Sequence, residues 1–86
     1  MGCKIVFAPQ ALDDLRRIVT RIARANPDAA VRIGTSLIDR VAILAEFPLL
    51  GSSYAKRHGI RKLLLRPYLI FYRANVEEGS VEILRY

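Results

Sequence analysis

Arginine, lysine and tyrosine are the side chains of this sequence that suit chemistry with an anionic partner. Between Leu49 and Val76 the chain has no acidic residue. Guanidinium groups pair with phosphates and carboxylates, and tyrosine rings stack on bases or pack against apolar groups. We therefore expect one face of a sheet, with the loop that enters it, to bind an acidic partner. The candidate binding residues are Arg57, Arg61, Lys62, Arg66, Tyr68, Tyr72, Arg73, Arg85 and Tyr86.

Residue types that carry covalent or metal-dependent chemistry are scarce. The sequence has one cysteine, Cys3, and one histidine, His58, so the usual zinc ligands cannot be assembled. No glycine-rich phosphate loop and no catalytic pair of carboxylates can be recognised. We expect neither a metal nor a cofactor, and the residues by themselves do not establish an enzyme.

Composition limits the class of protein further. The 86 residues form a single domain, 1–86, because 52% of them are hydrophobic and a chain of this length supports one core. The net charge of +6 favours an acidic partner: nucleic acid, an acidic protein segment or a membrane surface. We expect no segment that crosses a bilayer and no signal peptide. The single Cys3 cannot form an internal disulfide, so we expect a cytoplasmic protein.

Two amphipathic helices are predicted in the first half of the chain. In residues 10–24, Leu12, Leu15 and Val19 recur at steps of three and four, which is typical of one buried helix face. The charged residues of this segment, Asp14 among them, are expected on the opposite side.

The second helix follows a break at residues 26–28 and extends to about residue 46, where Phe47-Pro48 ends it. The short connection predicts an antiparallel helical hairpin. Gly34 lies on the apolar side of this helix and is expected to allow close approach of the first helix.

The second half of the chain predicts strands. After a loop at residues 49–59, strand-like runs occupy residues 60–66, 68–75 and 81–86, which we expect to form an antiparallel meander. A further strand at residues 3–8 joins at an edge or beside the final strand. The predicted fold class is α+β, in the order β-α-α-β-β-β, with the helical hairpin packed on a small antiparallel sheet.

Five segments form a recognisable series: residues 7–15 (FAPQALDDL), 26–30 (NPDAA), 44–51 (LAEFPLLG), 67–73 (PYLIFYR) and 81–85 (VEILR). In this order they resemble the toxins of the RelE/ParE superfamily of type II toxin–antitoxin systems, and the ParE branch most. The resemblance covers nearly the whole chain, and the β-α-α-β-β-β order is also that of the superfamily.

The resemblance implies one of two activities on the same fold. RelE-like members cut mRNA in the ribosome, whereas ParE-like members poison DNA gyrase. RelE-like nucleases have an arginine directly after the tyrosine of the strand at residues 68–75, and here that position is Leu69, which favours the ParE branch and a toxin without catalysis of its own. The alternative, an mRNA endonuclease, would place basic residues around phosphate: Arg61, Lys62, Arg66 and Arg85.

The resemblance also implies the partners. A ParE-like toxin of a plasmid-stabilising system is held inactive by a ParD-like antitoxin that binds DNA through its other domain, so the toxin reaches DNA only indirectly. We expect an acidic, amphipathic helix of the antitoxin to lie beside the helical hairpin. ParE-like chains usually continue past the Ile-Leu-Arg run with a tail that carries His and Arg, and this sequence ends at Tyr86. A non-toxic remnant that only binds an antitoxin is therefore a third hypothesis.

Overall fold

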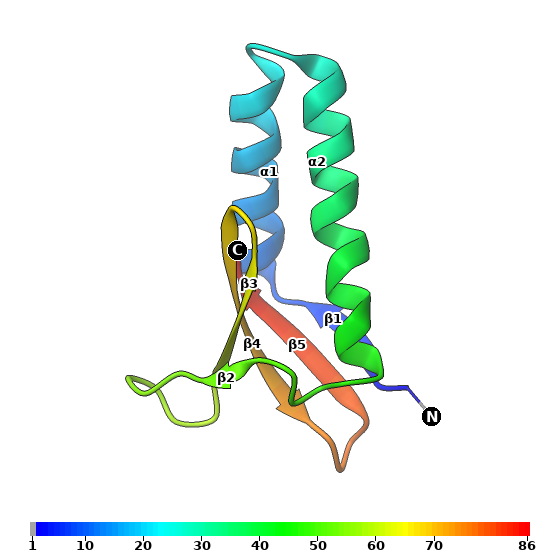
Figure 1. Cartoon of the computed structure of the whole chain (residues 1–86), viewed down its shortest axis with the longest axis vertical. Coiled ribbons are helices and arrows are strands. Elements are labelled where there is room, and N and C mark those ends of the chain that lie inside the picture. The colour runs from blue at the N-terminus through cyan, green and yellow to red at the C-terminus, as the bar shows by residue number, and fades with distance from the viewer. Residues whose placement is uncertain (1) are drawn as a thin grey trace.

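The molecule consists of a helical hairpin that stands on a five-stranded sheet (Figure 1). The structure is a computed structural model, and it describes residues 2–86. The predicted order of helices and strands is confirmed, with one additional two-residue strand. The elements in chain order are β1 (Lys4–Phe7), α1 (Pro9–Ala23), α2 (Pro27–Arg40), the 3-10 helix η1 (Val41–Ala45), β2 (Ser52–Ser53), β3 (Arg61–Leu65), β4 (Tyr68–Asn75) and β5 (Ser80–Arg85).

Local sequence signals account for the helix ends. Both helices begin at a proline, whose missing N–H is not needed in the first turn. Asn26 caps α2, because its side-chain oxygen accepts a hydrogen bond of 3.0 Å from the N–H of Ala29. The second helix was expected to continue to residue 46, but its last turn tightens into η1. In a 3-10 helix residues three apart lie on one side, so Val41 and Leu44 both face the core and are buried.

The strand order in the sheet is β1-β5-β4-β3-β2. The antiparallel meander of β3, β4 and β5 is as predicted, and β1 lies at an edge beside the final strand. The expectation of an entirely antiparallel sheet was wrong, because β1 pairs with β5 in parallel, with Ile5 opposite Val81. The sheet is therefore mixed. The additional strand β2 falls in the segment expected to be a loop, where Ser52 and Ser53 pair with the start of β3 and show no apolar alternation of their own.

The core has two parts. One lies between the sheet and the base of the hairpin, and the other lies between the two helices higher up, where Leu15, Ile18 and Leu37 meet Tyr68 and Tyr86. The close approach of the helices at Gly34 is confirmed, since a Cβ there would lie 2.9 Å from the Cγ2 of Val19. The buried residues of the first part are Ala11, Val41, Leu44, Leu65, Ile70, Tyr72, Val81 and Ile83.

A buried tyrosine fixes the loop that enters the sheet. Tyr72 is fully buried, and its hydroxyl accepts a hydrogen bond of 2.8 Å from the N–H of Gly51. The carbonyl of Gly51 accepts a further bond of 2.8 Å from the Nη1 of Arg61. A Cβ at Gly51 would lie 2.5 Å from the carbonyl oxygen of Lys62 and 2.8 Å from the Tyr72 hydroxyl. Only glycine therefore fits here without displacing the backbone of β3.

Gly51→Ala tests this close approach. We expect the free energy of unfolding to fall by about 1–3 kcal/mol, because the added methyl group meets backbone that cannot move away cheaply. Urea denaturation followed by circular dichroism measures the change. The neighbouring Ser52→Ala, at an exposed position, serves as the control and should stay within about 0.5 kcal/mol of the parent. Equal stability of both variants would contradict the packing described for Gly51.

Candidate functional site

The predicted binding residues do not share one face of the sheet. Successive side chains of a strand point to opposite faces, so Arg61 lies on the side of the helices while Lys62 lies on the opposite side. Tyr72 is also on the helix side and is fully buried, so it contacts no partner from there. The expectation of a single basic face was therefore wrong for Arg61 and Tyr72. Both have structural roles at Gly51 instead.

The face of the sheet turned away from the helices is apolar at its centre and basic at its margin. Leu64 and Leu69 are paired across β3 and β4 and are 51% and 40% exposed. Arg73 lies 3.7 Å from the carboxylate of Glu82 on β5. We refer to this surface as the outer sheet face, and its residues are Val6, Lys62, Leu64, Leu69, Phe71, Arg73, Glu82 and Leu84.

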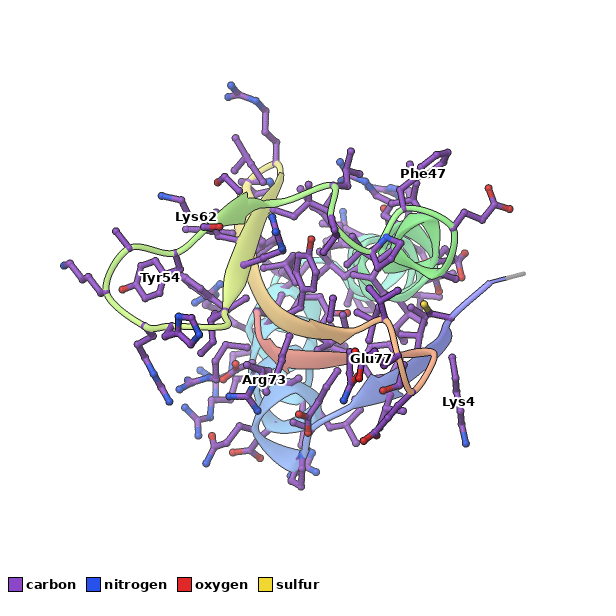
Figure 2. The ribbon with its side chains drawn as sticks, turned by 90° about the horizontal axis from the view of Figure 1, so that it is seen from below. Lys4, Phe47, Tyr54, Lys62, Arg73 and Glu77 are labelled. Atoms are coloured by element: carbon purple, nitrogen blue, oxygen red, sulfur yellow. The ribbon has the colours of Figure 1, made fainter. Side chains whose placement is uncertain are left out.

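The loop between β2 and β3 folds over one end of the outer sheet face. The ring of Tyr54 meets that of Phe71 edge to face, with centroids 5.1 Å apart. Tyr54 and Lys62 lie on one side of the molecule and Lys4 on the other (Figure 2). A cavity of about 210 Å³ opens here, lined by Arg57, Arg85 and largely apolar residues. Arg57 thus lies where it was predicted, on a loop beside the sheet.

A group of hydrogen bonds joins the end of β5 to the two helices. We call it the clasp, and its residues are Asp14, Leu37, Arg85 and Tyr86. Arg85 donates two hydrogen bonds to the carboxylate of Asp14, of 2.7 Å from Nε and 3.0 Å from Nη2. The N–H of Tyr86 donates a third, of 3.1 Å, and the Tyr86 hydroxyl donates to the carbonyl of Leu37 at 2.9 Å. Both residues were predicted to bind a partner, but their polar groups are bonded within the fold.

The clasp changes the acidity of its members. Hydrogen bonds from Arg85 hold the pKa of the Asp14 carboxyl below its ordinary value, although burial opposes them. Burial raises the pKa of the Tyr86 phenol to about 12. The amphipathic pattern of residues 10–24 predicts Asp14 on the outward side of its helix, and this prediction is wrong because Asp14 is buried. Asp14 lies three residues after Ala11 and four before Ile18, which are both buried. Residues at these spacings share one helix face, so the sequence did contain a signal that Asp14 lies on the buried side.

A second basic surface lies between α2 and the turn that joins β3 to β4. Arg66 and Tyr68 meet Arg32 and Arg40 there around a hollow of about 320 Å³. Arg40 donates a hydrogen bond of 3.3 Å to the carbonyl of Arg66. Among residues 2–86, no carboxylate lies within ion-pairing distance of these three arginines. We call this surface the hairpin groove, and its lining is Arg32, Ile33, Ser36, Leu37, Arg40, Arg66, Pro67 and Tyr68.

The hairpin groove combines an apolar floor with a cationic rim. Leu37 is 2% exposed and Ile33 and Tyr68 are half-buried, so the floor is fixed by the packing between the helices. Arg66 and Tyr68 are among the binding residues predicted from the sequence, but the two arginines of α2 are not. Arg32 and Arg40 are eight residues apart on one helix, which is a spacing that places both side chains on the same side. That spacing was the sequence signal for a basic surface on α2.

The four residues considered for phosphate cleavage lie in four different surroundings. Arg61 bonds to Gly51, and Lys62 lies on the outer sheet face. Arg66 lies at the hairpin groove, and Arg85 is held by Asp14. Groups that stabilise charge in a reaction have to converge on one point. The described residues do not form such a set in this arrangement.

No helix within residues 2–86 is long and apolar enough to span a membrane.

Two solved structures of toxin–antitoxin systems contain a chain with a similar fold. The chain is similar to a chain of the chromosomal ParDE TA system from P. aeruginosa, with a TM-score of 0.81 and 22% identity over 98% of this chain and 92% of that chain. It is also similar to a chain of the RelBE2 toxin–antitoxin complex from Mycobacterium tuberculosis, with a TM-score of 0.71 and 24% identity over 99% of this chain and 95% of that chain. No curated protein matches significantly.

The fold and the sequence thus define a type II toxin of the RelE/ParE superfamily. The model of one family, the ParE toxin of the type II toxin–antitoxin system parDE, matches residues 5–85, and the chain belongs to that family.

Asp14→Asn tests the clasp. The folded protein lowers the pKa of Asp14, so its contribution to stability is present above the unfolded-state pKa of about 4 and is lost as the pH falls below it. We expect the variant to be about 1–2 kcal/mol less stable at pH 7, since Arg85 is half exposed and water weakens the pair. The deficit should shrink between pH 4 and pH 2, as measured by urea denaturation at each pH.

The adjacent Asp13 is the matched control for Asp14. It pairs with Arg16 and Arg17 at the surface, so Asp13→Asn should cost less than about 1 kcal/mol. If both variants lose the same stability with the same dependence on pH, the clasp has no special role.

Proposed function

We propose that this protein is a ParE-like toxin that inhibits DNA gyrase by protein–protein contact in the bacterial cytoplasm, as part of a plasmid-stabilising pair with an antitoxin. Its membership of the ParE toxin family supports the proposal. The observation that carries it is the exposed apolar pair of Leu64 and Leu69 at the centre of the outer sheet face. An exposed apolar patch with a charged margin is typical of a protein-binding surface.

Leu69 also bears on the alternative activity. The resemblance implies an arginine at this position in the nuclease branch, and a leucine can neither donate a hydrogen bond nor hold charge. The other residues considered for cleavage, such as Lys62 and Arg85, lie apart and have different partners. These observations favour target binding over mRNA cleavage, although one structural neighbour is a RelBE2 toxin–antitoxin complex.

A supercoiling assay with purified gyrase tests the proposed target. We expect the chain to inhibit supercoiling, and Leu64→Asp/Leu69→Asp to weaken inhibition at least about tenfold, because the charges must be desolvated at an apolar contact. Val31→Asp is the control, since Val31 is 69% exposed on α2, far from the outer sheet face. Full activity of gyrase at excess toxin, together with mRNA cleavage on expression, would instead support the endonuclease. If the chain neither inhibits gyrase nor causes mRNA cleavage, and its expression does not arrest growth, the result would support the non-toxic remnant.

We also propose that the hairpin groove receives the acidic, amphipathic segment of the antitoxin. Apolar side chains of such a segment fit the floor formed by Ile33, Leu37 and Tyr68. Its carboxylates would then meet the unpaired guanidinium groups of the rim, at which charge-assisted hydrogen bonds are strong. The floor would supply most of the affinity and the rim the rate of association.

Charge reversal at the rim of the groove tests this placement. Arg61 is unsuitable because it supports Gly51, so the variant is Arg32→Glu/Arg66→Glu, both at exposed positions. We expect association with the antitoxin to slow by about tenfold at low salt and to lose most of its salt dependence. Stopped-flow fluorescence measures the rate. Arg21→Glu/Arg24→Glu changes the net charge equally on another surface, and a similar slowing in both variants would refute the placement.

A further inference from the structure

The outer side of α1 carries a row of arginines that takes no part in the clasp or the hairpin groove. Arg16 and Arg17 are adjacent, and Thr20, Arg21 and Arg24 follow them at spacings of three and four, so these residues lie on one side of the helix. All five residues are exposed, and together they line a shallow hollow of about 370 Å³. We call this surface the arginine face.

The second half of α1 is accessible to a large partner. The molecule is elongated, 42 × 30 × 21 Å, and the far halves of both helices project beyond the sheet (Figure 1). The side of α1 that carries Ile18 packs inward, which leaves the arginine face to solvent. Arg17 and Arg24 are about 10 Å apart along the axis at about 1.5 Å per residue.

The composition of the arginine face selects among anionic partners. No apolar side chain lines it, so a peptide would find no anchor of the kind that supplies affinity in protein interfaces. No aromatic ring lines it either, so it offers no platform on which single-stranded bases could stack. What remains is a row of guanidinium groups, which is suited to the phosphates of a duplex backbone.

Two of the arginines are partly neutralised. Asp13 accepts hydrogen bonds from Arg16 at 3.3 Å and from Arg17 at 2.8 Å. Arg21 and Arg24 have no carboxylate within ion-pairing distance among residues 2–86. These two arginines are therefore the strongest contributors to the positive field of the arginine face.

We propose that the arginine face binds the backbone of double-stranded DNA directly and without sequence preference. Duplex DNA carries about one negative charge per 1.7 Å of its axis, so several phosphates fall within the length of the row. This goes beyond the proposed function and differs from the expectation, implied by the resemblance, that the toxin reaches DNA only through the antitoxin. The toxin then adds phosphate contacts of its own wherever an antitoxin or a target already holds it near DNA.

Fluorescence anisotropy with a labelled duplex of about 20 base pairs, measured over a series of salt concentrations, tests the proposal. We expect Arg21→Glu/Arg24→Glu to weaken binding at least about tenfold and to reduce the slope of log K against log salt by about 2. The matched control is Arg32→Glu/Arg66→Glu, which has the same net charge. It should weaken binding less than about threefold, because distant charges act only through a screened field.

Three outcomes would overturn the proposal. Equal losses in the two double variants would mean that net charge alone attracts DNA. An unchanged salt slope in Arg21→Glu/Arg24→Glu would mean that these arginines touch no phosphate. Tighter binding to single-stranded DNA than to the duplex would mean that the arginine face does not recognise a duplex backbone. Because Arg21→Glu/Arg24→Glu is expected to bind the antitoxin normally, this result is independent of the test of the hairpin groove.

Discussion

A carboxylate that is 7% exposed needs a cation and further hydrogen-bond donors, because an unpaired buried charge is strongly destabilising. Asp14 finds them 71 and 72 residues away in the sequence, in the guanidinium of Arg85 and the N–H of Tyr86. This contact joins the first helix to the last strand. It orients the end of β5 across the hairpin, where the Tyr86 hydroxyl bonds to the second helix through Leu37. Hydrogen bonds of two neighbouring residues, Arg85 and Tyr86, thus link the sheet to both helices.

The surfaces proposed for binding depend on this arrangement. Tyr86 packs with Leu15, Ile18 and Leu37 in the upper part of the core, and Leu37 is also the floor of the hairpin groove. Arg85 lines the cavity at the end of the outer sheet face while it holds Asp14. Water weakens the pair on the side of Arg85, which is half exposed, but the buried carboxylate of Asp14 makes the loss of its partner costly. The pair also has a geometric role, because it joins α1 to the end of β5 beside the residues that Tyr86 packs against.

The sequence predicted the elements well, because the apolar residues of α1 repeat with a helical period and the second half contains short apolar runs bounded by turn residues. It failed where a polar group is buried or where pairing comes from distant strands. Asp14 looked like a surface charge because its partner lies at the other end of the sequence. The parallel pairing of β1 and the strand at Ser52 depend on neighbours that local sequence does not reveal. Arg61 and Tyr72 looked like binding residues because charge and aromatic character do not tell which strand face is buried.

The positive charge of the chain suggested one acidic partner. In the folded protein, however, the basic residues are divided between surfaces of different chemistry, such as the hairpin groove and the arginine face. In the hairpin groove, Arg32 and Arg66 surround apolar side chains that a protein segment can cover, so burial adds to charge. On the arginine face there is nothing apolar to cover, so attraction depends on charge alone and on salt. The first arrangement selects a partner by shape and the second accepts any dense row of phosphates. Net charge therefore describes how strongly this protein attracts anions, whereas the side chains between the arginines decide which anions stay bound.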